Sequence, residues 1–221
     1  MSCGVEDYPK LVQQQRDTWD SVPNSETQTI YYYAGYKTEL IGDRLIIDTR
    51  EGHGYFYIKT MKAFEHLLTM EWDYIFKTDN SAYVYKQELV KVLEDKPRGS
   101  FYGGHYYKTQ SALSPPFLWG EGMAFSRDVV KYLVDDYKTS QVPRYGVEDV
   151  HIGMILQDRF PWNTSMMIHE YHKESFMINH VYRCKDNRLG CSLEQQLEAM
   201  RDLHSKITAI ESERGEKKKG T

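Results

Sequence analysis

Apolar residues along the chain follow two spacings, which together predict alternating strands and helices. Short continuous apolar runs between polar residues are typical of buried strands, and apolar residues that return every three or four positions are typical of amphipathic helices. The spacing of three or four positions predicts helices over 8–18, 60–70, 86–95, from Ser126 onward, and over 147–157 and 193–210. The short continuous apolar runs predict strands over 30–36, 45–47, 74–76, 101–107, 123–125, 166–168 and 176–178.

Residues 45–76 combine a strand, a helix and a second strand, which is the building block of a mostly parallel sheet. The helix places Met61, Phe64 and Leu67 on one face, where they would pack on that sheet. The expected fold class is therefore α/β, with a mixed, mostly parallel central sheet flanked by helices. Asp79 follows the second strand, so we expect it at the carboxyl edge of the sheet, where such folds bind ligands.

The ends of the chain and its cysteines bear on domain organisation. We expect one domain over 1–213 and a flexible tail or linker start over the Lys- and Gly-rich residues 214–221. The chain has no signal peptide and no apolar run of the roughly 18 residues that a membrane span needs. Three cysteines cannot pair completely. These features predict a soluble protein of a reducing compartment, the cytoplasm.

Composition narrows the classes of partner. A formal net charge of −4 argues against a nucleic-acid binder, which would carry a clustered basic surface. The 18 tyrosines are an unusual feature of the composition. Most are explained as strand residues, although tyrosine also lines pockets in which its ring stacks on a sugar or base.

The short run Asp79-Asn-Ser81 supplies three oxygen-bearing side chains at the end of a predicted strand. Oxygen ligands suit a divalent ion that bridges a nucleotide diphosphate. An Asp followed by Asn and Ser is also typical of a turn in which the Asp side chain bonds the backbone. The spacing alone leaves both interpretations open.

Glu148 and Asp149 stand at the start of a predicted helix. The amino end of a helix favours negative charge whatever the function, so the pair is explained by the helix dipole alone. The functional alternative is a general base that removes a proton from an attacking hydroxyl. The late histidines His169, His172 and His180 are candidate metal ligands, although each taken separately fits a structural role.

Five blocks of sequence occur in a fixed order between about residues 16 and 180. They are Arg16-Asp-Thr-Trp19, Tyr57-Ile-Lys-Thr60, Tyr74 to Val84, Pro116 to Ser126 and Glu148-Asp-Val-His-Ile-Gly153. Together they resemble the β-1,3-galactosyltransferase and fringe-type glycosyltransferases. The resemblance implies a GT-A fold and transfer of a hexose from a UDP-sugar donor to a hydroxyl of a glycan or glycoprotein, with Mn²⁺ or Mg²⁺ as cofactor.

The resemblance also implies roles for individual residues. Asp149 falls on the catalytic base, and Asp79, Ser81 and His180 on the metal site, with His172 and His169 as second choices. Gly120, Glu121 and Gly122 lie where donor sugar and acceptor would meet. The residues expected to bind the nucleotide sugar are Arg16, Tyr57, Lys59, Thr78, Asp79, Asn80 and Gly122.

Two departures from the family keep alternatives open. Asp79 is the only carboxylate left in the acidic triplet, so the chain could be a non-catalytic nucleotide-sugar or glycan-binding module. A metal-independent transferase would instead use Lys59 or Lys77 against the diphosphate. The family's membrane anchor is missing, which suggests a bacterial or large-virus enzyme similar to the capsid-modifying glycosyltransferases of chloroviruses, acting in the host cytoplasm.

Overall fold

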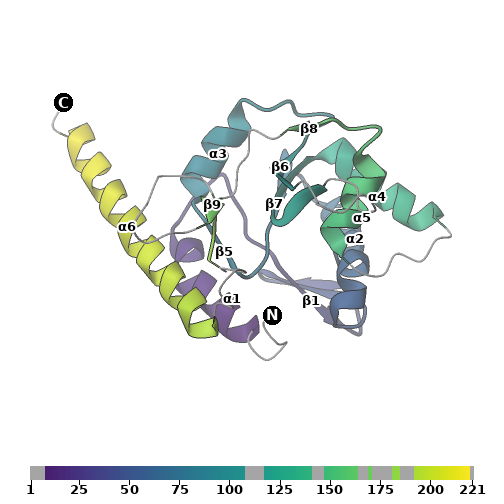
Figure 1. Ribbon diagram of the computed structural model, residues 1–221, viewed down its shortest axis with the longest axis horizontal. Coiled ribbons are helices and arrows are strands. Elements are labelled where there is room, and N and C mark those ends of the chain that lie inside the picture. Colours follow the sequence, from purple (N-terminus) through teal and green to yellow (C-terminus); the bar gives the residue numbers. More distant parts are fainter. Residues whose placement is uncertain are drawn as a thin grey trace. The chain divides into compact units, whose positions relative to one another are not determined.

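The computed structural model describes residues 8–107, 117–140, 147–163, 169–170, 181–184 and 192–219. Figure 1 shows the described helices and strands in chain order. The chain divides into two compact units, each made of segments far apart in sequence. Unit 1 comprises 1–27, 79–94 and 168–221, and unit 2 comprises 28–78 and 95–167. Each unit is described by itself below.

Among the described residues, unit 2 contains most of the strands, three α-helices and one short 3-10 helix. Its strands are β1 (Tyr31–Gly35), β2 (Glu39–Ile41), β3 (Arg44–Asp48), β4 (Tyr74–Lys77), β6 (Tyr102–Tyr107), β7 (Phe117–Ser126) and β8 (Trp162–Asn163). Its helices are the short 3-10 turn η3 (His53–Tyr55), α2 (Phe56–Leu67), α4 (Arg127–Thr139) and α5 (Glu148–Leu156).

The strands of unit 2 form two sheets. The larger has the order β4-β7-β6-β8, with β7 antiparallel to both β4 and β6 and β8 parallel to β6. The smaller has the order β1-β3-β2. Gly104 of β6 lies so close to β7 that a Cβ there would come within 2.6 Å of the Gly122 carbonyl oxygen. Glycine is therefore required where these two strands meet.

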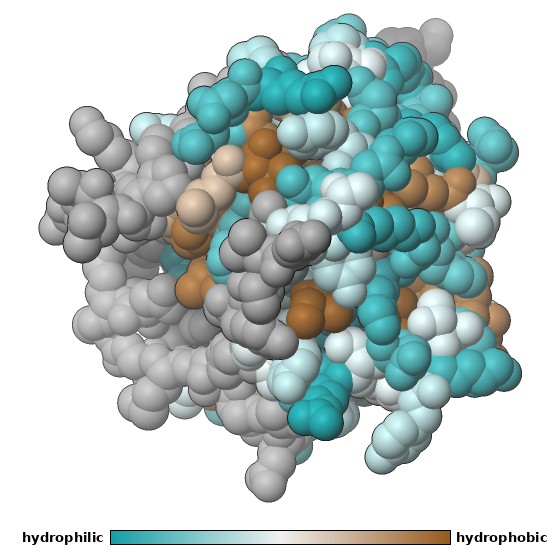
Figure 2. Space-filling view, turned by 90° about the vertical axis from the view of Figure 1, so that its right-hand side faces the viewer, coloured by the Kyte–Doolittle hydropathy of each residue, from teal (hydrophilic) through white to brown (hydrophobic). Residues whose placement is uncertain are grey.

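Helices α2, α4 and α5 pack against one another, and α4 and α5 also contact β7 (Figure 1). The core between them is apolar and includes Phe64 of α2, Phe125 of β7 and Leu133 of α4. The rings of Phe64 and Phe125 meet edge to face with 5.4 Å between centroids. On the face shown in Figure 2, hydrophilic residues predominate among those coloured and hydrophobic ones lie between them in separate patches. The helices thus bury one side and expose the other, as their spacing predicts.

Unit 1 is built from the two ends of the chain and a central segment. Its elements are α1 (Tyr8–Asp17), the 3-10 helix η2 (Trp19–Ser21), β5 (Ala82–Val84), α3 (Lys86–Glu94), β9 (His169–Glu170), β10 (Val181–Arg183) and α6 (Leu193–Lys219). The strand order is β5-β10-β9, and α6 contacts both α1 and β5. None of the helices in the described ranges is long and apolar enough to cross a membrane.

The predicted mixture of helices and strands is confirmed, but the mostly parallel central sheet is not found. Among the described residues, four of the seven strand pairings are antiparallel. The strand-helix-strand unit exists as β3, α2 and β4, yet β3 and β4 belong to different sheets. Periodicity predicts each helix and strand but not which strands pair. Strand β4 pairs with β7, which is distant in sequence, so no local pattern identifies it as the partner.

Several boundaries also differ from the prediction. Helix α2 starts at Phe56 rather than residue 60, and β7 extends over Phe117–Ser126 rather than 123–125. Helix α6 continues to Lys219, through residues assigned to a tail, because Lys and Glu are good helix formers. The predicted strands 166–168 and 176–178 lie outside the described residues.

Candidate active site

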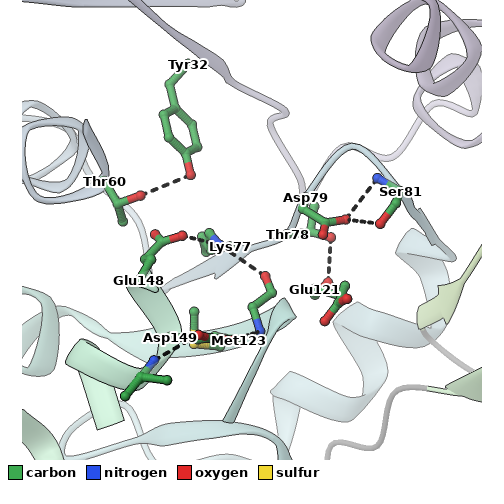
Figure 3. Close-up of polar contacts among 12 residues, drawn as sticks. Tyr32, Thr60, Lys77, Thr78, Asp79, Ser81, Glu121, Met123, Glu148 and Asp149 are labelled. Atoms are coloured by element: carbon green, nitrogen blue, oxygen red, sulfur yellow. Dashed lines mark hydrogen bonds and ion pairs between the residues drawn. The ribbon is translucent and has the colours of Figure 1, made fainter. Parts of the chain in front are cut away.

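Asp149 lies in the first turn of α5, and two backbone N–H groups hold its carboxylate (Figure 3). Val150 N donates to Oδ1 over 2.8 Å, and Gly120 N of β7 donates to Oδ2 over 3.2 Å. Helix α5 is anchored on β7 by its buried residues Ile152 and Leu156, which fixes the carboxylate against that strand. Each carboxylate oxygen keeps a further lone pair with which to accept a proton or a hydrogen bond.

The charge state of Asp149 reflects opposing effects. Burial raises the pKa of this carboxyl above its usual range, and the Lys77 ammonium and the N–H groups of Val150 and Gly120 offset part of the rise. Glu148 adds a smaller upward push, because two neighbouring carboxylates repel each other. The group therefore ionises less readily than an ordinary Asp, which makes it a stronger base once ionised.

A buried ion pair lies beside Asp149. Lys77 Nζ, at the end of β4, is 2.8 Å from Glu148 Oε2, at the start of α5, and the two side chains are only 7% and 11% exposed. The ammonium also donates to the Gly120 carbonyl oxygen over 3.1 Å. Glu148 Oε1 is buried and has no hydrogen-bond partner among the described residues. The pair joins β4, β7 and α5 at one point, as Figure 3 shows.

The strand end that leads to Asp79 is tied to β7. Thr78 Oγ1 donates to the Glu121 carbonyl oxygen over 2.7 Å, and Lys77 pairs with Met123 in the β4–β7 ladder. Gly122 is buried between these two β7 residues. Thr78 therefore acts as a backbone anchor in this structure, and its hydroxyl is already engaged.

Two predicted nucleotide-binding residues occupy α2, where both make internal contacts. Tyr57 is 1% exposed, and its ring packs edge to face on His151 of α5 with 5.6 Å between centroids. Lys59 Nζ pairs with Glu51 over 2.8 Å and lies above the ring of Phe56. Their roles in binding stay predictions, since Tyr57 offers little ring surface and the charge of Lys59 is already balanced.

Asp79 and Ser81 form a tight turn in unit 1. The Ser81 N–H and hydroxyl both donate to Asp79 Oδ1, over 2.9 and 2.7 Å. This is the side-chain-to-backbone turn that the spacing allowed as an alternative. It brings two oxygen ligands together, and it leaves Asp79 Oδ2 and the hydroxyl lone pairs outside these bonds. The two residues thus fit a hard divalent ion as part of its ligand set.

Helix α1 supports this turn through a residue that sequence reasoning did not assign to the site. The buried Gln15 amide donates to the Asp79 and Ala82 carbonyl oxygens over 3.0 and 3.1 Å. Arg16, the next residue, is half-buried on the same helix, and Asn80 is half-buried within the turn. The signal for Gln15 was its place among the apolar residues of the predicted helix, where an uncharged amide needs partners.

The histidine candidates remain predictions. His180 and His172 lie outside the described residues. Only the backbone of His169 is described, and this residue of β9 pairs with Tyr182 of β10. Within the described ranges, no group of three or more His, Cys, Asp or Glu side chains is arranged to hold a metal ion. Of the residues predicted to bind the metal, Asp79 and Ser81 are therefore the two whose side chains the structure describes.

Comparison with known proteins gives one line of support. No protein-family model matches the chain. Over 136 residues the chain is 25% identical to a hydroxyproline O-galactosyltransferase of Arabidopsis thaliana. The matched region covers 53% of this chain and 20% of that relative's length. The similarity supports a glycosyltransferase relationship, while membership of the fringe-type family and a viral source remain predictions.

Proposed function

We propose that this protein is a glycosyltransferase that moves a hexose from a UDP-sugar to a hydroxyl of a glycan or glycoprotein, with Mn²⁺ or Mg²⁺ as cofactor. The distant galactosyltransferase relative supports the reaction class. That relative's name makes UDP-galactose the first donor to test. The structural observation that carries the proposal is the carboxylate of Asp149, fixed at a helix start by two backbone N–H groups.

The role proposed for Asp149 is that of a general base. An acceptor hydroxyl attacks the sugar only as its proton leaves, and a carboxylate within hydrogen-bond reach can take that proton. The N–H groups of Val150 and Gly120 hold the carboxylate in one orientation. Its raised pKa strengthens it as a base, and this role belongs to a reaction that inverts the anomeric centre.

The role proposed for Asp79 and Ser81 is to hold the divalent ion, with a histidine such as His180 completing the protein ligands. When bound, such an ion supplies positive charge that stabilises a diphosphate leaving group. Gln15 fixes the backbone on both sides of the turn, so the carboxylate is positioned before any ligand arrives. With one carboxylate in the acidic run, we expect the ion to bind weakly without donor and more tightly with it.

Calorimetry with Mn²⁺ and a panel of UDP-sugars tests the proposal. We expect UDP-sugars to bind only in the presence of the metal. Asp79→Ala should abolish this binding, and Asp149→Asn should leave it intact. Equal loss of binding in the two variants would contradict the separate roles, and no binding of any UDP-sugar would contradict the function. Activity retained in EDTA would favour a metal-independent transferase, although Lys77 and Lys59 are both already paired with carboxylates.

The second candidate is a non-catalytic nucleotide-sugar or glycan-binding module, and the observation that bears on it is a cavity within unit 1. This cavity of about 120 Å³ is lined by the aromatic side chains of Trp19, Tyr83 and Tyr85, together with Lys86 and Thr208. Aromatic rings can stack on the apolar face of a sugar, but these three aromatic side chains are 5%, 1% and 3% exposed, so the cavity would have to open to admit one. A donor hydrolysis assay separates the candidates, because a binding module would hold a UDP-sugar without turning it over.

A further inference from the structure

One ammonium and two carboxylates meet where β4 ends and α5 begins. Lys77 carries the positive charge, and Glu148 and Asp149 are adjacent carboxylates on the first turn of the helix. The ammonium forms its ion pair with Glu148 at 2.8 Å, whereas Asp149 is bonded to backbone N–H groups. The two carboxylates therefore have different partners although they are neighbours in sequence.

Gly120 shows how close the ammonium is to Asp149. A Cβ on Gly120 would lie 3.6 Å from Lys77 Nζ and 3.4 Å from Asp149 Oδ2. The Gly120 carbonyl oxygen accepts from the ammonium, and the Gly120 N–H donates to Asp149. Both charged groups thus contact the same residue of β7, and a modest side-chain movement would bring Lys77 to Asp149.

We propose that Glu148 is a positioning residue for sugar transfer: it holds the Lys77 ammonium away from Asp149, so that the Asp149 carboxylate stays available to the acceptor hydroxyl. This inference rests on the proposed function, because it assigns Asp149 the part of the base. A carboxylate bound directly to an ammonium is a weaker base, and its lone pairs are occupied. Glu148 prevents that pairing by occupying the ammonium itself.

The three groups predict shifts of opposite sign for two variants of one ion pair. In Glu148→Gln the ammonium loses its carboxylate partner and is free to pair with Asp149, and a repelling charge also disappears. In Lys77→Met the attracting charge is removed and Glu148 remains. Asp149 should therefore titrate at lower pH in the first variant and at higher pH in the second, each by about one pH unit. Tyr102 of β6 also faces Asp149 and stays neutral in this range, since burial raises its pKa.

The experiment is a carbon-13 NMR titration of the Asp side chains in the whole protein, with Asp149→Asn used to assign the Asp149 signal. Glu65→Gln is the matched control, because it removes a carboxylate from another Lys–Glu pair, which joins Glu65 to Lys138 on α2 and α4. We expect the opposite shifts stated above and none in the control. Shifts of the same sign in both variants, or none, would overturn the proposal.

A steady-state measurement links the titration to the reaction. Glu148→Gln should lower kcat about tenfold at neutral pH and leave the KM for the donor unchanged, with the acid side of the pH profile moved to lower pH. If either single variant fails to fold, the double variant Lys77→Met/Glu148→Gln removes both buried charges, and its Asp149 must titrate above the wild-type value. A double variant at or below that value would overturn the proposal.

The two proposals can fail separately. Opposite titration shifts in a protein that transfers no sugar would support the arrangement of charges and contradict the proposed function. Sugar transfer with unmoved Asp149 titration in both variants would support the function and overturn the role of Glu148.

Discussion

Lys77 and Glu148 form an ion pair at 2.8 Å that is almost wholly removed from solvent. It connects the last residue of β4 to the first residue of α5, so it fixes the helix that carries Asp149. Buried charges lose hydration, and such a pair is maintained only with good geometry and further hydrogen bonds. Here the Gly120 carbonyl oxygen provides one such bond.

Removing one partner of this pair should destabilise the protein strongly. Lys77→Met leaves Glu148 buried without its counter-charge, and we expect the free energy of unfolding to fall by about 3–5 kcal/mol. Replacing both residues, as Lys77→Met/Glu148→Gln, should recover most of that loss. Chemical denaturation measures both. The exposed pair Lys138–Glu65 is the control, where removing one partner should cost about 1 kcal/mol or less.

Asp149→Asn should reduce sugar transfer by about 10²- to 10⁴-fold, the usual contribution of a positioned base. The amide keeps the shape of the side chain but cannot accept a proton. Initial rates of UDP release measure the loss, and donor affinity by calorimetry should be unchanged. A variant with near-normal rates would show that another group removes the proton.

The pH profile of transfer should fall on its acid side at a pH above the ordinary Asp pKa of about 3.9. The reason is that burial raises the pKa of Asp149, and only the ionised carboxyl acts as base. The contribution of Asp149 to the free energy of unfolding depends on pH in the opposite direction to its activity as a base. A raised folded-state pKa means that this group's stabilising contribution is present at low pH and lost as pH rises through that pKa. An acid limb near or below the ordinary value would contradict the assignment.

Asp128→Ala should destabilise the start of α4 by about 1 kcal/mol at neutral pH. Asp128 Oδ1 accepts from the Ser126 hydroxyl over 2.6 Å, and Oδ2 accepts from Ser100 N over 2.8 Å. Burial would raise the pKa of Asp128, but these hydrogen bonds outweigh it and hold the pKa below its usual range. The difference from wild type should therefore disappear as pH falls through that lowered pKa. Denaturation at several pH values tests this, with the exposed Asp135→Ala as control.

Gln15→Leu should weaken metal-dependent UDP binding although Gln15 is not expected to touch either ligand. Its amide bonds the carbonyl oxygens on both sides of the Asp79–Ser81 turn, and a buried unsatisfied carbonyl costs about 1–3 kcal/mol. Calorimetry measures UDP binding and chemical denaturation measures the free energy of unfolding, so together they separate loss of the turn from loss of the whole fold. The exposed Gln13→Leu on the same helix should leave UDP binding at its wild-type value.

The sequence predicted local helices and turns well. The helix start at Glu148 and Asp149 was expected from two adjacent acids, and α5 begins there. The turn at Asp79 was expected as one of two alternatives, and its hydrogen bonds are those of such a turn. Each of these features depends on residues a few positions apart.

Relationships between distant segments could not be predicted in the same way. Glu148 was explained by the helix dipole, so nothing pointed to a partner on β4. Its ion pair with Lys77 depends on α5 packing on β7 and on β7 pairing antiparallel with β4. The mostly parallel sheet is not found among the described residues for the same reason, since periodicity does not determine which strands pair.

The most direct measurement is the rate of UDP release from UDP-galactose and related UDP-hexoses with Mn²⁺, compared between the wild-type protein and Asp149→Asn. We expect release by the wild-type protein with at least one donor and a loss of about 10² or more in the variant. Equal rates in the two proteins, or no release and no binding with any donor, would contradict this expectation.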